Sequence, residues 1–224
     1  MKVTIFKNVY DKTNPHHIAL ETALQRIQTG KSSTLVSNVR NGDKEKKKEL
    51  PVVCFSGEFS SRADDALFEH SGFIVLDFDH VDVDSTKAAL GMDDFIHSCW
   101  TSPSGNGIKA LVHITNPERH RDHFRALVKY FEKQHGLEVD ESGVNESRAC
   151  YESHDPDIII KDDFKKFERL YLSSNKITDA GAATIIAAID AGGIPMLESV
   201  TLGNNSIASA RHRDVESAIQ RRYG

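Results

Sequence analysis

Apolar and polar positions change between strand and helix spacing along residues 1–166. Alternating or continuously apolar segments predict strands at residues 3–9, 50–55, 73–76, 96–101 and 108–114. Apolar residues at helical spacing predict two long helices at about 15–28 and 117–134. Asn-Pro pairs precede both helices, and Gly30 and Gly136 follow them as helix stops. Interleaved strands and helices indicate an α/β or α+β domain rather than a helical bundle.

Three of these strands allow a more specific prediction. Residues 73–76 are apolar on both faces, which is typical of a central strand covered on both sides. The strands at 96–101 and 108–114 flank a Gly- and Ser-rich turn, so we expect a β-hairpin there. Between residues 56 and 72 the pattern predicts a turn and a short helix.

The pattern changes after about Lys166. Five residues, Phe167, Leu170, Leu172, Asn175 and Ile177, recur 30 positions later as Leu197, Val200, Leu202, Asn205 and Ile207. This spacing resembles the helix-containing, ribonuclease-inhibitor-like branch of leucine-rich repeats. We therefore predict two domains, residues 1–166 and 167–224, the second with about two repeat-like β-α units. Because two such units rarely bury their apolar face alone, we expect them to pack on the first domain, pair with another chain, or be a fragment of a longer array.

Composition and charge limit the classes of function. The chain of 224 residues carries a formal net charge of −5, which argues against coating of nucleic acid by bulk electrostatics. The acidic excess lies wholly within residues 1–166. Three cysteines without a CxxC pair predict reduced thiols. No apolar run approaches a membrane span, and Lys7 interrupts the opening stretch, so we expect a cytoplasmic protein that does not contact membranes.

Two carboxylates, Asp77 and Asp79, end the apolar segment at 73–76. Side chains two residues apart on a strand share a face, so both carboxylates would enter one site. A divalent cation would relieve their mutual repulsion, and Mg²⁺ prefers such oxygen ligands. The alternative is a solvated strand end with no bound ion.

The hairpin turn offers a candidate phosphate cradle. Ser102 and Ser104 supply hydroxyl groups, Gly105 and Gly107 allow backbone amides to converge, and Lys109 adds a positive charge. This turn is not a Walker A loop, because both the GxxxxGK[ST] spacing and the following helix are absent. An ordinary turn is the alternative interpretation.

Further charged residues could complete the site. Asp140 is expected at the end of another strand as a third carboxylate, although Asp155 competes for that role. Arg148 could neutralise phosphate through its planar fork of donors. The run Lys46, Lys47 and Lys48 predicts either a solvated loop or a contact to a nucleic-acid phosphate chain.

Three motifs in this order, SGEFSSRADDALFEHSGFIVLDFDH, WTSPSGNGIKALVHI and LEVDESGVNESRACYESHDPD, resemble the primase-polymerase domain of the archaeo-eukaryotic primase superfamily. The likeness is greatest to the VirE N-terminal-like branch of mobile elements and phages, and it covers about residues 1–165. It implies an α+β catalytic core, a mixed sheet with an RRM-like unit and packed helices. It also implies that Asp77, Asp79 and Asp140 bind Mg²⁺ or Mn²⁺. Nucleotide contacts would come from Ser102, Ser104, Lys109 and Arg148. The superfamily commonly has histidine where this chain has Lys109. This difference is compatible with a phosphate contact but leaves open whether the chain is catalytically active.

The expected function is that of a DNA primase or polymerase. It would be a metal-dependent nucleotidyltransferase that extends a 3′ hydroxyl along a single-stranded DNA template with nucleoside triphosphates. A helicase is an expected partner, because the chain has no Walker A segment of its own. Two alternatives remain: a catalytically silent module that binds nucleotides or single-stranded DNA in a replication protein, and a leucine-rich-repeat interaction module. The sequence does not decide between ribonucleotides and deoxyribonucleotides.

Overall fold

The computed structural model describes residues 1–172, 174–191 and 197–223. The chain divides into two compact units, Met1–Lys165 and Lys166–Gly224, each of which is described by itself. The sequence predicted this boundary after Lys166, one residue later than the division after Lys165 in the structure. Ser173, Gly192 and Gly193 of the predicted repeat segment lie outside the described residues.

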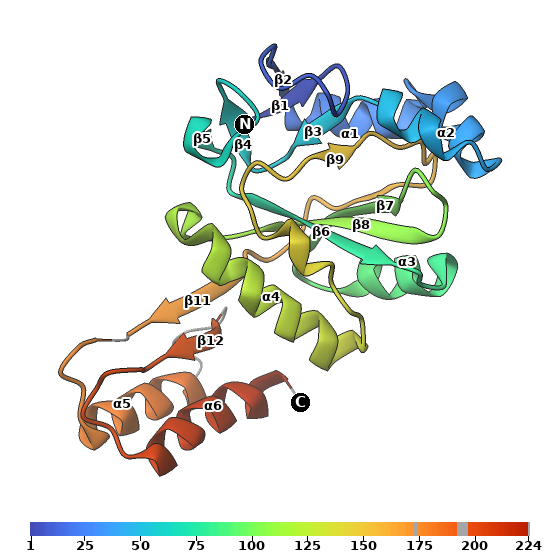
Figure 1. The fold of residues 1–224 in the computed structure, drawn as a ribbon. Helices are drawn as coiled ribbons and strands as arrows, with labels where there is room; N and C mark the ends of the chain where they lie inside the picture. Colours follow the sequence, from blue (N-terminus) through green and yellow to red (C-terminus); the bar gives the residue numbers. More distant parts are fainter. Residues whose placement is uncertain (173, 192–196, 224) are drawn as a thin grey trace. The chain divides into compact units, whose positions relative to one another are not determined.

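The first unit contains two four-stranded sheets (Figure 1). The first sheet has the order β2-β1-β3-β9, with bounds His16–Ala19, Lys2–Phe6, Val52–Cys54 and Cys150–Tyr151. The second has the order β10-β7-β8-β6, with bounds Ile159–Ile160, Ile96–Thr101, Gly107–His113 and Phe73–Asp79. Every described strand pair in these sheets is antiparallel, so the expected mixed sheet is not found in this unit.

Helices and a short hairpin complete this unit. The α-helices are α1 (Leu20–Thr29), α2 (Ser33–Arg40), α3 (Val83–Met92) and α4 (His120–His135). The 3₁₀ helices are η1 (Lys44–Glu49), η2 (Asp64–Ala66), η3 (Pro117–Arg119) and η4 (Glu141–Gly143). Strands β4 (Gly57–Phe59) and β5 (Leu67–His70) form an antiparallel pair where the sequence predicted only a turn and a short helix.

Strand β6 shows how the unit packs. Phe73 and Val75 join one buried cluster with residues of α1 and of the first sheet. Phe78, on the opposite face, contacts Phe131 of α4 with ring centroids 5.3 Å apart. Both faces of β6 are therefore covered, as its apolar sequence indicated. The prediction of a central strand was nevertheless wrong, because β6 lies at the edge of its sheet beside β8.

The first helix begins later than expected. Residues His16–Ala19 pair with β1 as an edge strand, and α1 begins only at Leu20. The Asn14-Pro15 pair therefore does not begin a helix. The end of α1 agrees with the prediction, because Gly30 adopts the left-handed conformation, with φ of 73°.

The predicted hairpin and the second long helix are both present. β7 spans Ile96–Thr101 as expected, and β8 follows at Gly107. Helix α4 ends where Gly136 adopts a φ of 63°. Helices α2 and α3 were not predicted, although Asp82 caps α3 by accepting a hydrogen bond of 2.9 Å from the Ser85 amide.

The second unit repeats a strand and a helix. Strands β11 (Glu168–Tyr171) and β12 (Leu197–Thr201) are parallel, and helices α5 (Asp179–Asp190) and α6 (Ser209–Tyr223) follow them. Asn175 and Asn205 each donate to the carbonyl oxygen of the leucine three residues earlier, at 2.9 Å in both cases. The unit has a buried apolar cluster of its own, which includes Ile189, Leu202 and Val215. It therefore forms a core from two β-α pairs, which the sequence analysis did not expect.

A histidine pair, with His120 buried and His70 partly buried, links β5 to α4. The Nδ1 atom of His70 accepts a hydrogen bond from the Gly72 amide at 2.9 Å, so its Nε2 carries the proton toward Nδ1 of His120, 3.0 Å away. Burial lowers the pKa of His70 to about 4 and, with the neighbouring His70, that of His120 to about 3. Both rings are therefore neutral near pH 7.

This pair predicts a loss of stability in mild acid. Below the ordinary histidine pKa of about 6.5, the unfolded chain takes up protons that the folded chain does not, so the free energy of unfolding falls as the pH decreases. At pH 5 the cost is about 2 kcal/mol for His120. Urea unfolding at pH 7 and pH 5 should show a smaller pH dependence for His120→Asn, which does not titrate. An equal pH dependence in the variant and the wild type would contradict this account.

No helix among the described residues is long and apolar enough to cross a membrane.

Candidate functional site

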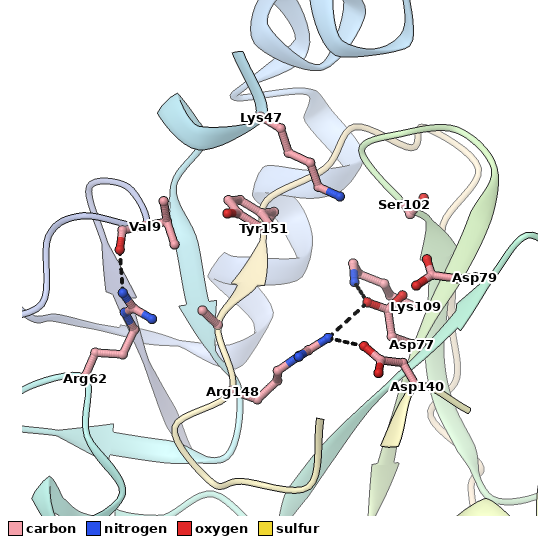
Figure 2. A pocket seen from close by; sticks show the side chains of 11 residues that line it. Val9, Lys47, Arg62, Asp77, Asp79, Ser102, Lys109, Asp140, Arg148 and Tyr151 are labelled. Atoms are coloured by element: carbon pink, nitrogen blue, oxygen red, sulfur yellow. Dashed lines mark hydrogen bonds and ion pairs between the residues drawn. The ribbon is translucent and has the colours of Figure 1, made fainter. Parts of the chain in front are cut away.

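A cavity of about 370 Å³ lies beside the ends of β6 and β8 (Figure 2). Its lining is more polar and charged than apolar, with four cationic and three anionic side chains. The lining residues are Val9, Lys47, Arg62, Asp77, Asp79, Ser102, Lys109, Asp140, Arg148, Ala149 and Tyr151.

The alternation of β6 directs two carboxylates into this cavity. Phe73 and Val75 face the core shared with the first sheet, and Asp77 and Asp79 follow on the same face of the strand. The face that is apolar in the core thus becomes acidic where the strand leaves it. The sequence prediction that both carboxylates enter one site agrees with this arrangement.

The third carboxylate of the cluster is Asp140, although it does not end a strand. It precedes the 3₁₀ helix η4, where its side chain accepts a hydrogen bond from the Ser142 amide at 3.0 Å. Its own amide donates to the backbone carbonyl of Asp77 at 2.9 Å, which fixes the loop against β6. Asp77, Asp79 and Asp140 each offer a carboxylate oxygen, and these three atoms lie within 4.8 Å of one another.

Asp155, the competing candidate, lies outside this cluster. Its carboxylate accepts hydrogen bonds from the Lys87 ammonium group and the Thr101 amide, both at 2.7 Å. Burial raises the pKa of Asp155, but the hydrogen bonds from Lys87 and Thr101 outweigh burial and hold it below its ordinary value. Asp155 therefore supports the hairpin through the Thr101 amide and does not complete the acidic cluster.

Two cations neutralise part of the cluster. Lys109, paired with Asp77 across β6 and β8, forms an ion pair with that carboxylate while its side chain is only 8% exposed. Burial lowers the pKa of Lys109, but the neighbouring Cys150 and Asp77 outweigh burial and hold it above its ordinary value. Lys109 is thus a charged partner of Asp77, where the sequence analysis expected a phosphate ligand.

Arg148 bridges two of the carboxylates. Its Nη2 atom lies 2.7 Å from Asp140 and 3.7 Å from Asp77 (Figure 2). Its Nη1 atom donates to the Ser142 hydroxyl at 2.8 Å. Burial raises the pKa of Asp140, but Ser142 and Arg148 outweigh burial and lower it overall. The sequence analysis placed Arg148 near phosphate, and in this structure it contacts carboxylates.

The donor set fits a divalent cation. The Oδ1 atom of Asp77 is buried and has no hydrogen-bond partner among the described residues, which leaves one oxygen available to a ligand. Three carboxylates, two on β6 and one before η4, supply the oxygen ligands that Mg²⁺ and Mn²⁺ prefer. Lys109 and Arg148 already offset two of the three negative charges, so a cation would have to compete with them.

The hairpin contributes the Ser102 hydroxyl group to the cavity, and two of its amides are used within the turn. Ser102 is 4% exposed, and its Oγ atom has no hydrogen-bond partner among the described residues. The amides of Ser102 and Gly105 are used within the turn, on Gly107 and Ser102 carbonyl oxygens at 2.8 and 3.0 Å. Gly105 and Gly107 do not line the cavity. Gly107 is required by packing, because a Cβ atom there would lie 2.6 Å from the Phe78 carbonyl oxygen.

The lysine run divides between two environments. Lys46 and Lys48 form ion pairs within η1, with Glu49 at 2.8 Å and Glu45 at 2.9 Å. Lys47 lines the cavity, and its ammonium group donates to the Ser104 hydroxyl at 3.3 Å. Ser104 itself does not line the cavity. The structure thus brings only one of the three predicted lysines to the site.

Sequence reasoning missed the wall opposite the carboxylates. Arg62 and Tyr151 line the cavity together with Val9 and Ala149. Arg62 is held by a 2.5 Å hydrogen bond from Nη2 to the Val9 carbonyl oxygen. Arg62 and Tyr151 lie within the first and third motifs, but no spacing related them to Asp77, because the two sheets meet only in the folded chain.

Comparison with known proteins identifies one family. Residues 45–159, just over half of the chain, match the family model described as BT4734-like, N-terminal domain. Apart from Val9, all residues that line the cavity fall within the matched segment. No curated protein and no solved structure matched the chain. The chain therefore belongs to the BT4734-like N-terminal domain family.

Proposed function

We propose that the first unit is a metal-dependent nucleotidyltransferase of the primase-polymerase type, related to the archaeo-eukaryotic primase superfamily. One observation carries the proposal. Two carboxylates from β6 and a third from the distant loop at Asp140 gather within 4.8 Å, in the same cavity as the buried Ser102 hydroxyl that lacks a partner among the described residues. An acidic cluster beside a donor-lined cavity is what a metal-bound triphosphate requires.

Asp77, Asp79 and Asp140 would hold one or two Mg²⁺ or Mn²⁺ ions. Bound ions of this kind activate a 3′ hydroxyl and stabilise the pyrophosphate leaving group in nucleotidyl transfer. The chain's own residues place these ligands: the Asp140 amide on the Asp77 carbonyl oxygen fixes the distance between loop and strand. The ion pair with Lys109 orients the Asp77 side chain.

Charge balance supports a polyanionic substrate. The cavity contains four cations and three carboxylates, so it carries one excess positive charge before any metal binds. Adding divalent ions increases this excess, and a triphosphate offsets it. The Ser102 hydroxyl would donate to a phosphate oxygen. Arg148 could transfer from the carboxylates to phosphate as metal binds.

The proposal is tested by primer synthesis and primer extension on single-stranded DNA. The full chain is incubated with Mg²⁺ or Mn²⁺ and with ribonucleoside or deoxyribonucleoside triphosphates separately, and product length is measured. We expect template-dependent incorporation that EDTA abolishes. Absence of incorporation with either metal and either class of nucleotide would contradict the enzymatic proposal.

One observation favours a second candidate, a catalytically silent nucleotide-binding module. Lys109 and Arg148 occupy the carboxylates that a metal would need. Saturable binding of a triphosphate without turnover at any concentration of Mg²⁺ or Mn²⁺ would support this candidate.

For the second unit we propose two leucine-rich-repeat-like units that bind another protein; a helicase is a candidate partner of the first unit in its replication role. The paired asparagine turns at Asn175 and Asn205 support the repeat interpretation.

A further inference from the structure

We infer that Lys47 binds a phosphate group of the nucleotide and does not contact the backbone of the template strand. This inference rests on the proposed function and refines its substrate site. It assigns to the nucleotide one residue of a lysine run for which the sequence alone predicts either a solvated loop or a contact to a nucleic-acid phosphate chain.

The position of Lys47 relates it to the candidate phosphate site. Its side chain extends from η1 into the cavity, toward the hairpin that carries Ser102 (Figure 2). The ammonium group lies 3.3 Å from the Ser104 hydroxyl and 5.5 Å from the centroid of the Tyr151 ring. Lys47 thus reaches across from one wall of the cavity to the turn on the other.

Lys47 is also held in place. Leu50, directly after η1, is fully buried and packs with Val36 and Val39 of α2. Tyr151, beneath the Lys47 ammonium group, packs against the same cluster. A cation on a fixed stem loses less conformational entropy on binding than a lysine on a free loop.

The charge of Lys47 is available to an anion. Lys109 and Arg148 form ion pairs with the carboxylates of the cavity. Among the described residues, Lys47 and Arg62 are the cavity cations that form no ion pair, and the cavity-facing Lys47 is bound only by a neutral hydroxyl and an aromatic ring. A phosphate oxygen is a stronger acceptor for an ammonium group than a neutral hydroxyl.

The neighbouring lysines provide matched controls. Lys46 and Lys48 belong to the same 3₁₀ helix, yet they pair with Glu49 and Glu45 and do not line the cavity. Removing either charge tests the general electrostatic effect of the run. Removing the charge of Lys47 tests the cavity contact.

The experiment compares wild type, Lys47→Gln, Lys46→Gln and Lys48→Gln by isothermal titration calorimetry. The titrants are a nonhydrolysable nucleoside triphosphate with Mg²⁺, tripolyphosphate with Mg²⁺, and a single-stranded DNA oligonucleotide. We expect Lys47→Gln to weaken both phosphate titrants about tenfold, as loss of one charge-assisted hydrogen bond predicts. Its affinity for the oligonucleotide should stay within about twofold of wild type, and Lys47→Arg should recover most of the triphosphate affinity.

The outcomes separate the two proposals. If wild type binds the triphosphate and Lys47→Gln binds it equally well, the assignment of Lys47 is wrong while the proposed function stands. If Lys47→Gln weakens only the oligonucleotide, the lysine contacts the template and the inference is overturned. If wild type binds no triphosphate in the presence of Mg²⁺, the proposed function itself is contradicted. Equal weakening by all three glutamine variants would show a general charge effect and overturn the specific contact.

Discussion

Replacing Asp79 with asparagine is expected to lower the rate of metal-dependent nucleotide incorporation by about 100-fold or more. Mutation of residues that merely support metal ligands lowers metal affinity or activity about 10- to 100-fold in many sites, so loss of a direct ligand should lower it at least as much. Asp79 is exposed at the end of β6, and its oxygen lies within 4.8 Å of those of Asp77 and Asp140. The fold should therefore tolerate the change, and the free energy of unfolding should stay within about 0.5 kcal/mol of wild type.

A comparison with Asp77→Asn makes this prediction sharper. Asp77 forms an ion pair with the buried Lys109, so its replacement leaves an ammonium group uncompensated and should also reduce stability. Asp84→Asn, an exposed change in the first turn of α3, is the control for charge alone. Incorporation rates and urea unfolding are measured for all three variants. If Asp79→Asn retains the wild-type rate, Asp79 does not bind a catalytic metal.

Replacing Arg26 with methionine is expected to reduce the free energy of unfolding by about 3 kcal/mol. Arg26 of α1 contacts both carboxylate oxygens of Glu152, at 2.5 and 3.1 Å, and Ser32 donates to the same group. The Glu152 side chain is 1% exposed, so loss of Arg26 leaves a buried carboxylate with only a neutral donor. The cost arises from this uncompensated charge and exceeds the worth of the pair itself.

The double variant separates these two quantities. Arg26→Met with Glu152→Gln removes both charges, and we expect it to be more stable than Arg26→Met alone. Chemical denaturation of the wild type, both single variants and the double variant completes the cycle. If Arg26→Met unfolds at the wild-type denaturant concentration, the ion pair makes no contribution to stability.

Local sequence patterns were sufficient for some elements of the fold. The hairpin β7–β8 was predictable because apolar strands flank a glycine- and serine-rich turn, and this information lies within 20 residues. The ends of α1 and α4 were predictable because Gly30 and Gly136 readily adopt positive φ. Long-range pairing changed other elements. His16–Ala19 forms a strand because β1 offers it an unpaired edge. β6 is an edge strand, and its two faces are covered by the core shared with α1 and the first sheet and by α4.

For the candidate site, the sequence by itself determined that Asp77 and Asp79 share a face, since side chains alternate along any strand. It did not determine which distant residue would join them. Only the tertiary structure decided that Asp140 joins the cluster and Asp155 supports the hairpin, that Lys109 and Arg148 face carboxylates, and that Lys47 alone of its run enters the cavity. The physical reason is that alternation follows from local backbone geometry, whereas the partner of a charged side chain depends on contacts between segments that meet only when the two sheets pack.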